Sequence, residues 1–440
     1  MNKVIGSFFI FVLTSLYLFP FELKGIPGIN TKMMLAAVGL CVYLIRLAKG
    51  QSGGFNRDTF LLSVYAAVFS LVSFAAVTYN GTPDYAFVFY IVSMWVWIGA
   101  AYLVINCMRA VHGLASVRLV IYYLAAVCVF QCAMALWIDS SEIVKRLVDT
   151  YIEQGQNFLN QRNVERLYGI GASLDVAGSR FSAVLALLAF LLVHLESNHE
   201  KTRLFLYLSA FVVIAVVGNI IARTTTVGLV VGILYLVYGT RLYTFRLLAT
   251  HKRLWISMGL LLLIAIPLLS YLYTNDPVFH KHLRFGFEGF FSLAEEGEWT
   301  VSSNERLQTM YVFPESLKTW IIGDGYFSNP RDVDPYFTGR YIGGYYMGTD
   351  VGYLRFIFYA GVLGLAAMTS VICKAFQIGW KRFPRQREVF LLLLLLNLII
   401  WLKVSTELFV VFALFLMIDK EEDDVYEQRV HLCNNQEIPK

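Results

Sequence analysis

The sequence is dominated by apolar runs that are each long enough to cross a membrane as a helix. About 20 apolar residues span the hydrocarbon core of a bilayer. We expect such spans near 4–20, 31–48, 58–78, 86–107, 116–138, 180–196, 203–221, 226–246, 254–273 and 350–373, with a last apolar stretch over 388–418. Polar residues from Lys403 to Glu407 interrupt that last stretch. It therefore predicts two short helices joined by a re-entrant turn, with one long tilted helix as the alternative. The fold class that follows is an all-α polytopic membrane protein with about 12 transmembrane helices.

The composition supports this class and argues against several others. Of the 440 residues, 58% are hydrophobic and only 15% are charged, whereas about a quarter of a soluble chain is charged. The sequence has neither a Gly-rich phosphate loop nor a dinucleotide fingerprint, and no basic aromatic face suggests nucleic acid. The six cysteines show no zinc-ligand spacing and no disulfide framework. We therefore expect no cofactor, no metal and no nucleic-acid partner.

The Lys and Arg residues of the short loops predict the orientation of the chain. Alternate loops carry most of these residues, for example Arg46 with Lys49 and Lys381 with Arg382, and such loops face the cytoplasm. An even number of helices then leaves both termini inside. Residues 1–419 form one integral membrane domain, with a first outer loop over 139–179 and a large periplasmic loop over 274–349. Residues 420–440 are expected to form an acidic, solvated cytoplasmic tail.

The same topology places several cationic residues near the outer surface of the bilayer, where they lie in or beside apolar segments. Arg166 ends the first outer loop, Arg180 opens the helix after it, and Arg223 lies in a tight hairpin between two apolar helices. Charged residues in membrane segments usually face a wet cavity and mark a site. Arginine suits a diphosphate because its planar fork binds phosphate oxygens bidentately. Snorkelling at a helix end is the alternative for Arg180.

Further charges at this level lie near the end of the chain. Asp350 and Arg355 begin the helix after the large loop, and Lys403 and Glu407 lie in the interrupted last stretch. Each has a structural alternative: Asp350 as a helix cap, Arg355 as a snorkelling side chain, and Lys403 with Glu407 as an ion pair at i, i+4.

The large loop itself carries a second pattern. Glu305 and Arg306 precede an expected amphipathic helix, and 323–326 is a glycine-punctuated turn. Aromatic residues alternate with Gly, Asp and Arg over 343–355. Aromatic rings stack on pyranose faces while polar groups bind hydroxyls, so this composition weakly favours sugar binding.

In this order along the chain, these motifs resemble the O-antigen polymerase and O-antigen ligase superfamily. The motifs are Arg-x-x-Gly at 166–169, Arg-Thr at 223–224, Glu-Arg at 305–306, Gly-Asp-Gly-Tyr at 323–326, Asp-Val-Gly-Tyr-Leu-Arg-(x)5-Gly-Val-Leu-Gly at 350–364, and Lys403. The resemblance covers roughly residues 150–420. It implies a GT-C-like membrane glycosyltransferase that needs no metal, in the bacterial inner membrane with its active site facing the periplasm.

The resemblance also implies substrates and residue roles. The donor would be an oligosaccharide on undecaprenyl diphosphate, held in the membrane lipid. Its diphosphate would be bound by cationic side chains, namely Arg166, Arg223, Arg306, Lys403 and Arg355. Asp350 or Glu305 would act as the catalytic base that accepts the proton of the attacking sugar hydroxyl. Whether a chain-length regulator protein also binds is left open.

Three functions compete at this point. Polymerisation of repeat units into O-antigen, capsule or exopolysaccharide is favoured, because ligases of this group usually carry His where this chain has Asp350, and the Bacteroides-type polymerases are the more similar. A ligase that transfers glycan to lipid A or protein is the first alternative. A transporter or flippase of lipid-linked sugars is the second, although no pair of related halves is visible.

Overall fold

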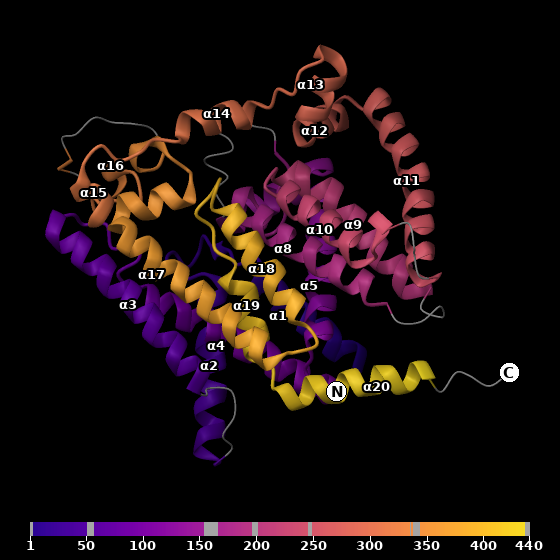
Figure 1. The fold of residues 1–440 in the computed structure, drawn as a ribbon, viewed down its shortest axis with the longest axis horizontal. Coiled ribbons are helices and arrows are strands. Elements are labelled where there is room, and N and C mark those ends of the chain that lie inside the picture. The colour runs from indigo at the N-terminus through magenta and orange to yellow at the C-terminus, as the bar shows by residue number, and fades with distance from the viewer. Residues whose placement is uncertain are drawn as a thin grey trace.

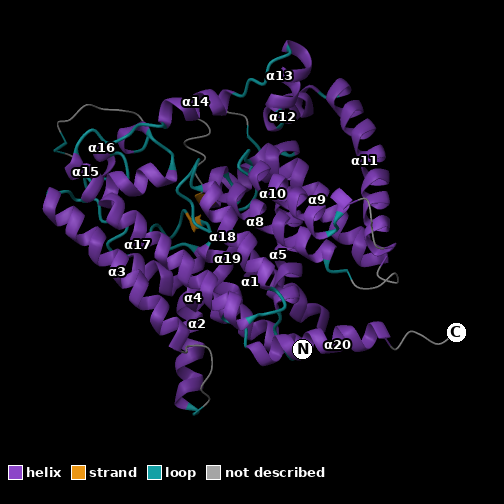
Figure 2. Ribbon diagram, viewed as in Figure 1, coloured by secondary structure: helices purple, strands orange, loops and turns teal. Residues whose placement is uncertain are grey.

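The fold was analysed in a computed structural model. It describes residues 3–50, 57–153, 166–195, 201–244, 249–334, 336–337 and 344–435. Residues 154–165 of the first expected outer loop and 338–343 of the large loop therefore lie outside the described residues. Helices make up most of the described chain (Figure 2).

The helices and strands run in a simple order along the chain. They are α1 (Lys3–Leu18), β1 (Glu22–Leu23), α2 (Thr31–Ala48), α3 (Arg57–Asn80), α4 (Tyr90–His112), α5 (Val117–Ser140), α6 (Glu142–Tyr151), β2 (Ile152–Glu153), α8 (Leu174–Val193), α9 (Lys201–Ile221), α10 (Thr225–Gly239), α11 (Ala249–Asn275), α12 (Pro277–Gly286), α13 (Glu288–Glu296), α14 (Ser302–Met310), α15 (Leu317–Ile321), α16 (Pro330–Val333), α17 (Gly352–Arg382), α18 (Arg387–Ile400), α19 (Phe409–Leu416) and α20 (Lys420–Asn435), with 3₁₀ turns η1 (Leu242–Thr244) and η2 (Tyr346–Gly348).

Eight of the described helices are long and apolar enough to cross a membrane. They are α2, α3, α4, α5, α8, α9, α11 and α17. The other spans expected from the sequence correspond to the shorter apolar helices α1, α10, α18 and α19. The architecture is compatible with an all-α membrane protein, and the count of about 12 spans stays a prediction.

The last apolar stretch is broken, as its polar residues predicted. α18 ends at Ile400 and α19 begins at Phe409, so one continuous helix over 388–418 is excluded. We call the non-helical residues 401–408 the break segment. Both ends of the segment have backbone partners, since Leu408 N donates to Asn397 Oδ1 at 2.8 Å and Tyr353 N donates to Trp401 O at 3.3 Å. These bonds matter because unpaired backbone N–H and C=O groups are costly in the hydrocarbon core of a bilayer.

Helix α8 lies at the centre of the bundle, where it packs against α5, α9, α10 and α18. It is the most buried of the eight candidate spans, because 89% of its most apolar stretch is buried inside the protein. α10 approaches it closely at Gly228, where a Cβ would lie 2.1 Å from the Ser182 Cα. Small residues permit such close helix contacts in membranes. This contact fixes the first turn of α10 against the middle of α8.

Gly228→Ala is therefore expected to destabilise the bundle. Overpacking a close contact costs about 1–3 kcal/mol, which should appear as a lower apparent Tm in mild detergent. Gly259→Ala is the matched control, because Gly259 lies on the exposed helix α11 with nothing within 4 Å of the added Cβ. Equal Tm values for the two variants would contradict the close contact.

The short helices and the tail lie at opposite ends of the bundle (Figure 1). α12 to α16 gather at one end, which we call the loop end. α20 and the N-terminus lie at the other, the tail end. The large loop thus holds short helices and turns, as expected. One feature was not expected: β1 and β2 form a small antiparallel pair, with Glu22 opposite Glu153 and Leu23 opposite Ile152.

The acidic tail is a docked helix, which corrects the expectation of a solvated end. Asp423 and Glu427 of α20 are each only 3% exposed. Arg118 Nε pairs with Glu427 Oε1 at 2.8 Å, and Asp423 accepts a hydrogen bond from Val117 N at 2.9 Å. The acidic run carries the counter-charges for basic helix ends.

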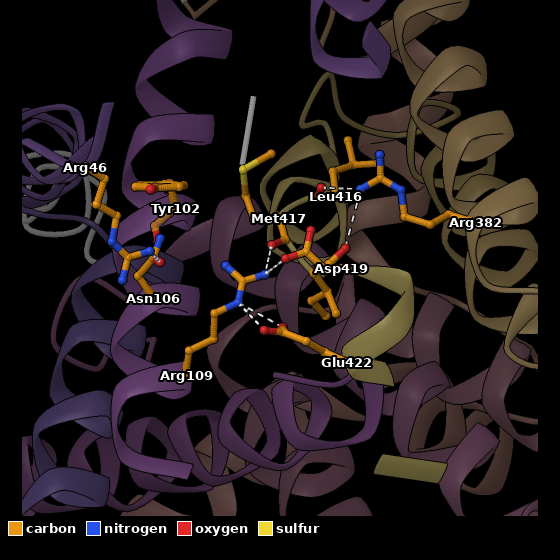
Figure 3. Close-up of polar contacts among 10 residues, drawn as sticks. Arg46, Tyr102, Asn106, Arg109, Arg382, Leu416, Met417, Asp419 and Glu422 are labelled. Carbon is orange, nitrogen blue, oxygen red and sulfur yellow. Dashed lines mark hydrogen bonds and ion pairs between the residues drawn. The ribbon is translucent and has the colours of Figure 1, made fainter. Parts of the chain in front are cut away.

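Figure 3 shows a second part of this docking surface. Arg109 Nε contacts both carboxylate oxygens of Glu422 at 2.8 Å, and its Nη2 pairs with Asp419 at 2.9 Å. Arg382 donates to Leu416 O at 2.6 Å, just before α20 begins. The helix is thus held by arginines from α4 and α5, while Arg382 of α17 binds the end of α19, which precedes it.

Arg118→Met is expected to destabilise the protein by about 3–5 kcal/mol, because it leaves the Glu427 carboxylate buried without its partner. Arg385→Met is the matched control, since the Arg385–Asp424 pair is 55% and 41% exposed and such pairs contribute about 0–1 kcal/mol. The measurement is thermal unfolding of both purified variants. Similar losses would show that burial of the Arg118 pair does not matter.

Candidate functional site

Three polar side chains of the break segment reach three different partners near the loop end. Lys403 Nζ donates to Thr224 Oγ1 at 3.3 Å, and Ser405 Oγ accepts from Arg355 Nη1 at 2.7 Å. Glu407 Oε2 accepts from Tyr90 O–H at 2.7 Å. Lys403 and Glu407 are therefore not an ion pair, because the backbone between them is not helical and sends them to different neighbours.

Arg223 lies in the turn between α9 and α10, directed toward the large loop. Its Nε donates to Phe285 O at 2.9 Å, and its Nη1 pairs with Glu288 Oε2 at 2.8 Å. The same Nη1 lies 3.2 Å from Ser302 Oγ, which itself donates to Glu288 Oε2 at 2.9 Å. The turn thus binds α13 and α14 of the loop end through one guanidinium group.

Arg166 lies over the same aromatic ring as Arg223. The Arg166 guanidinium carbon is 4.9 Å from the centre of the Phe285 ring, and that of Arg223 is 4.0 Å from it. Burial lowers the pKa of Arg166, and the nearby charge of Arg306 lowers it further, while Asp175 acts in the opposite direction. Arg166 Nε is buried and has no hydrogen-bond partner among the described residues. The structure therefore brings the two predicted arginines together.

Asp175, in the first turn of α8, links this pair to the break segment. Thr224 Oγ1 donates to Asp175 Oδ1 at 2.6 Å, while Lys403 donates to the same hydroxyl. Lys403 is also within electrostatic range of Arg166, Arg223 and Asp350. Lys403 thus joins the predicted cluster through the N-termini of α8 and α10.

Asp350 is half-buried and lies just before α17. The N-cap of that helix is Val351 and not Asp350, so the role of a simple helix cap does not apply. Burial raises the pKa of the Asp350 carboxyl, and repulsion from Asp175 raises it further, whereas Arg355, Arg306 and Lys403 oppose the rise. The carboxylate is therefore within electrostatic range of three of the predicted cations.

Arg355 is held tightly by its surroundings. It is only 6% exposed, and its guanidinium lies between the Phe327 and Tyr345 rings, at 3.6 and 3.5 Å. Nη2 donates to Phe327 O at 3.1 Å while Nη1 contacts Ser405. Gly352 lets α17 approach the break segment here, because a Cβ would lie 2.7 Å from Val404 O. These contacts suit a residue that positions the break segment.

Glu305 and Arg306 are exposed on α14. Arg306 is within electrostatic range of Arg166 and of Asp350. The side chain of Glu305 makes no hydrogen bond or ion pair with any described residue, so it has no contact that ties it to the cluster. Of the two predicted bases, the described contacts therefore favour Asp350.

The completed cluster holds five cationic side chains and three carboxylates. The cations are Arg166, Arg223, Arg306, Lys403 and Arg355, and the carboxylates are Asp175, Asp350 and Glu288. Sequence reasoning missed Asp175 and Glu288, although Asp175 follows the Arg-x-x-Gly motif closely. The excess of positive charge favours an anionic ligand.

Comparisons with known proteins add no relative. No protein-family model, no curated protein and no solved structure matches this chain. Within the described part of the chain, no group of three or more His, Cys, Asp or Glu side chains is placed to hold a metal ion.

Proposed function

We propose that this chain is a multi-pass glycosyltransferase of the bacterial inner membrane. It polymerises oligosaccharide repeat units carried on undecaprenyl diphosphate, at the periplasmic face. The observation that supports this proposal best is the meeting of Arg166 and Arg223 over the Phe285 ring, with Lys403 in electrostatic range of both arginines and of Asp350. A diphosphate is the anion that such a group of guanidiniums fits.

The proposed reaction needs two roles from these side chains. A hydroxyl of the acceptor sugar attacks the anomeric carbon of the donor, and the bond from that carbon to the diphosphate oxygen breaks. The diphosphate leaves with the electron pair, and Arg166, Arg223 and Lys403 neutralise its charge. Asp350 accepts the proton of the attacking hydroxyl. Its raised pKa brings the carboxylate closer to the strength that a general base needs near neutral pH.

Glu288 adds a specific feature to this proposal. It pairs with Arg223 at 2.8 Å, where a donor diphosphate would have to bind. We infer that Glu288 holds Arg223 in place until the diphosphate displaces it. Binding of the donor would then release α13 from the α9–α10 turn.

Purified protein in proteoliposomes with synthetic undecaprenyl-diphosphate-linked oligosaccharides tests the function. A ladder of products of increasing length supports polymerisation. Transfer of a single glycan to an added lipid A acceptor would instead make the protein a ligase. Movement of the intact lipid-linked sugar between leaflets, without a new glycosidic bond, would make it a transporter and end the proposal.

The orientation has its own expected result. A reporter enzyme fused after residue 320, in α15 at the loop end, should be active only in the periplasm. A fusion after residue 419, where α20 begins at the tail end, should be active only in the cytoplasm. The opposite pair of signals would place the cluster on the wrong face of the membrane for periplasmic polymerisation.

A further inference from the structure

Arg180 is a buried cation outside the site described above. It lies in α8 and is only 6% exposed. Its Nε and Nη1 are buried and have no hydrogen-bond partner among the described residues. It forms no ion pair with them, and its guanidinium carbon lies 5.8 and 5.9 Å from the centres of the neutral Phe19 and Trp97 rings. A buried charge normally has a partner, because desolvation is costly.

A second cation shares one of these rings. Lys32, in the first turn of α2, places its Nζ 4.4 Å from the centre of the Trp97 ring. Lys32 and Arg180 repel each other, and Glu407 is the carboxylate that attracts Lys32. Glu407 already accepts a hydrogen bond from Tyr90 at 2.7 Å. Glu407 is therefore a partner of Lys32 alone, while Arg180 has no carboxylate partner among the described residues, so the pair keeps an excess positive charge.

This second pair lies beside the first site without belonging to it. Arg180 and Asp175 are on the same helix, roughly 7–8 Å apart along its axis at 1.5 Å per residue. Glu407 and Lys403 lie at the two ends of the polar part of the break segment. Arg180 thus lies deeper in the bundle than the Arg166–Arg223 cluster. Lys32 is half-buried, so it is the more exposed member of the pair.

We propose that Arg180 and Lys32 bind the phosphate of a membrane lipid, at a second anion site next to the first. An anion between them would supply the missing counter-charge and the acceptors that the guanidinium lacks. The Trp97 ring lies beside both cations, and Phe19 beside Arg180, so the surroundings of the pair are apolar. The choice of lipid rests on the proposed function: a polymerase uses two lipid-linked substrates, and the second diphosphate would be that of the acceptor. A phospholipid of the bilayer is the other source of the same chemistry.

Binding of labelled, sugar-free undecaprenyl diphosphate to the full chain in phosphate-free maltoside micelles tests the proposal. The wild type should bind two equivalents, whereas Arg180→Gln and Lys32→Gln should bind one, with the second equivalent weakened about 10- to 100-fold. Arg223→Gln is the matched variant, because it should weaken the other equivalent and keep the one that depends on Arg180. Arg180→Lys keeps the charge and should restore part of the affinity if the Gln variant folds poorly.

Trp97 offers a readout that a purely structural role would not move. Its emission should change with the Arg180-dependent equivalent in the Arg223→Gln variant, and the change should disappear in Trp97→Phe. Phosphatidylglycerol as a second probe separates the two sources: competition at this equivalent would support the site and assign it to bilayer phospholipid. Two equivalents retained in Arg180→Gln, or only one in the wild type, would overturn the proposal. Arg180-dependent binding in a protein that makes no polymer would refute the proposed function alone.

Discussion

Asp350→Asn is expected to lower turnover by about 10²–10⁴-fold, the contribution of a general base. Asn keeps the shape of the side chain but cannot accept the proton of the attacking hydroxyl. Binding of the lipid-linked donor should change little, because the cationic side chains stay in place. The measurement is single-turnover transfer together with donor affinity. An equal loss of affinity and turnover would point to a structural role.

The second predicted base offers a direct comparison. Glu305 is exposed, and its side chain makes no hydrogen bond or ion pair with the described residues, so Glu305→Gln should keep most of the activity. A crippled Glu305→Gln beside an active Asp350→Asn would transfer the role of base to Glu305. Both variants leave the number of cationic side chains unchanged, so the comparison tests only the loss of one carboxylate.

The pH profile of the wild type follows from the same residue. Asp350 must be ionised to accept a proton, so turnover falls as the pH drops through its pKa. Burial raises that pKa above its usual value of 3.8. The acidic limb of the profile should therefore lie at a higher pH than an ordinary aspartate would give. The residual rate of Asp350→Asn should lack this limb.

The general architecture could be predicted because each membrane span is encoded by one continuous run of apolar residues. Each run can be recognised without knowledge of the rest of the chain. The break segment can be recognised too, because Lys403, Ser405 and Glu407 interrupt an apolar stretch. The tail was mispredicted for the opposite reason. An acidic run looks solvated unless its partners are known, and Arg109 and Arg118 lie about three hundred positions away. Residues 22–23 and 152–153 form strands too short to leave a pattern.

For the candidate site, the sequence predicted on which face of the protein the residues lie, but not which of them contact each other. Counting spans placed Arg166 and Arg223 on the same face, but nothing local could show that Phe285 of the large loop joins them. Asp175 resembles a common first-turn acid, and Glu288 resembles any loop carboxylate. Their roles depend on tertiary contacts with Thr224 and Arg223. Such contacts between distant segments cannot be predicted from a single sequence.

Arg223→Ala and Arg166→Ala are expected to lower turnover by about 10²–10³-fold each, the usual loss when one preorganised donor to a developing anion is removed. Membrane levels of both variants should match the wild type. Arg284→Ala is the matched control: Arg284 precedes Phe285 but pairs with Glu295 at 2.6 Å and is 42% exposed. Its loss should leave polymer length unchanged.

Glu288→Gln separates a diphosphate-binding role of Arg223 from a structural one. If Arg223 binds the donor diphosphate, removing its 2.8 Å ion-pair partner removes a competitor, and the donor should bind more tightly. A tenfold gain in affinity corresponds to about 1.4 kcal/mol, close to the lower end of what a hydrogen bond to a charged group contributes. If the pair only holds α13 against the turn, Glu288→Gln should lower the Tm and the activity together, as Arg223→Ala would. Opposite effects of Glu288→Gln and Arg223→Ala on donor affinity are thus the signature of a displaceable counter-ion.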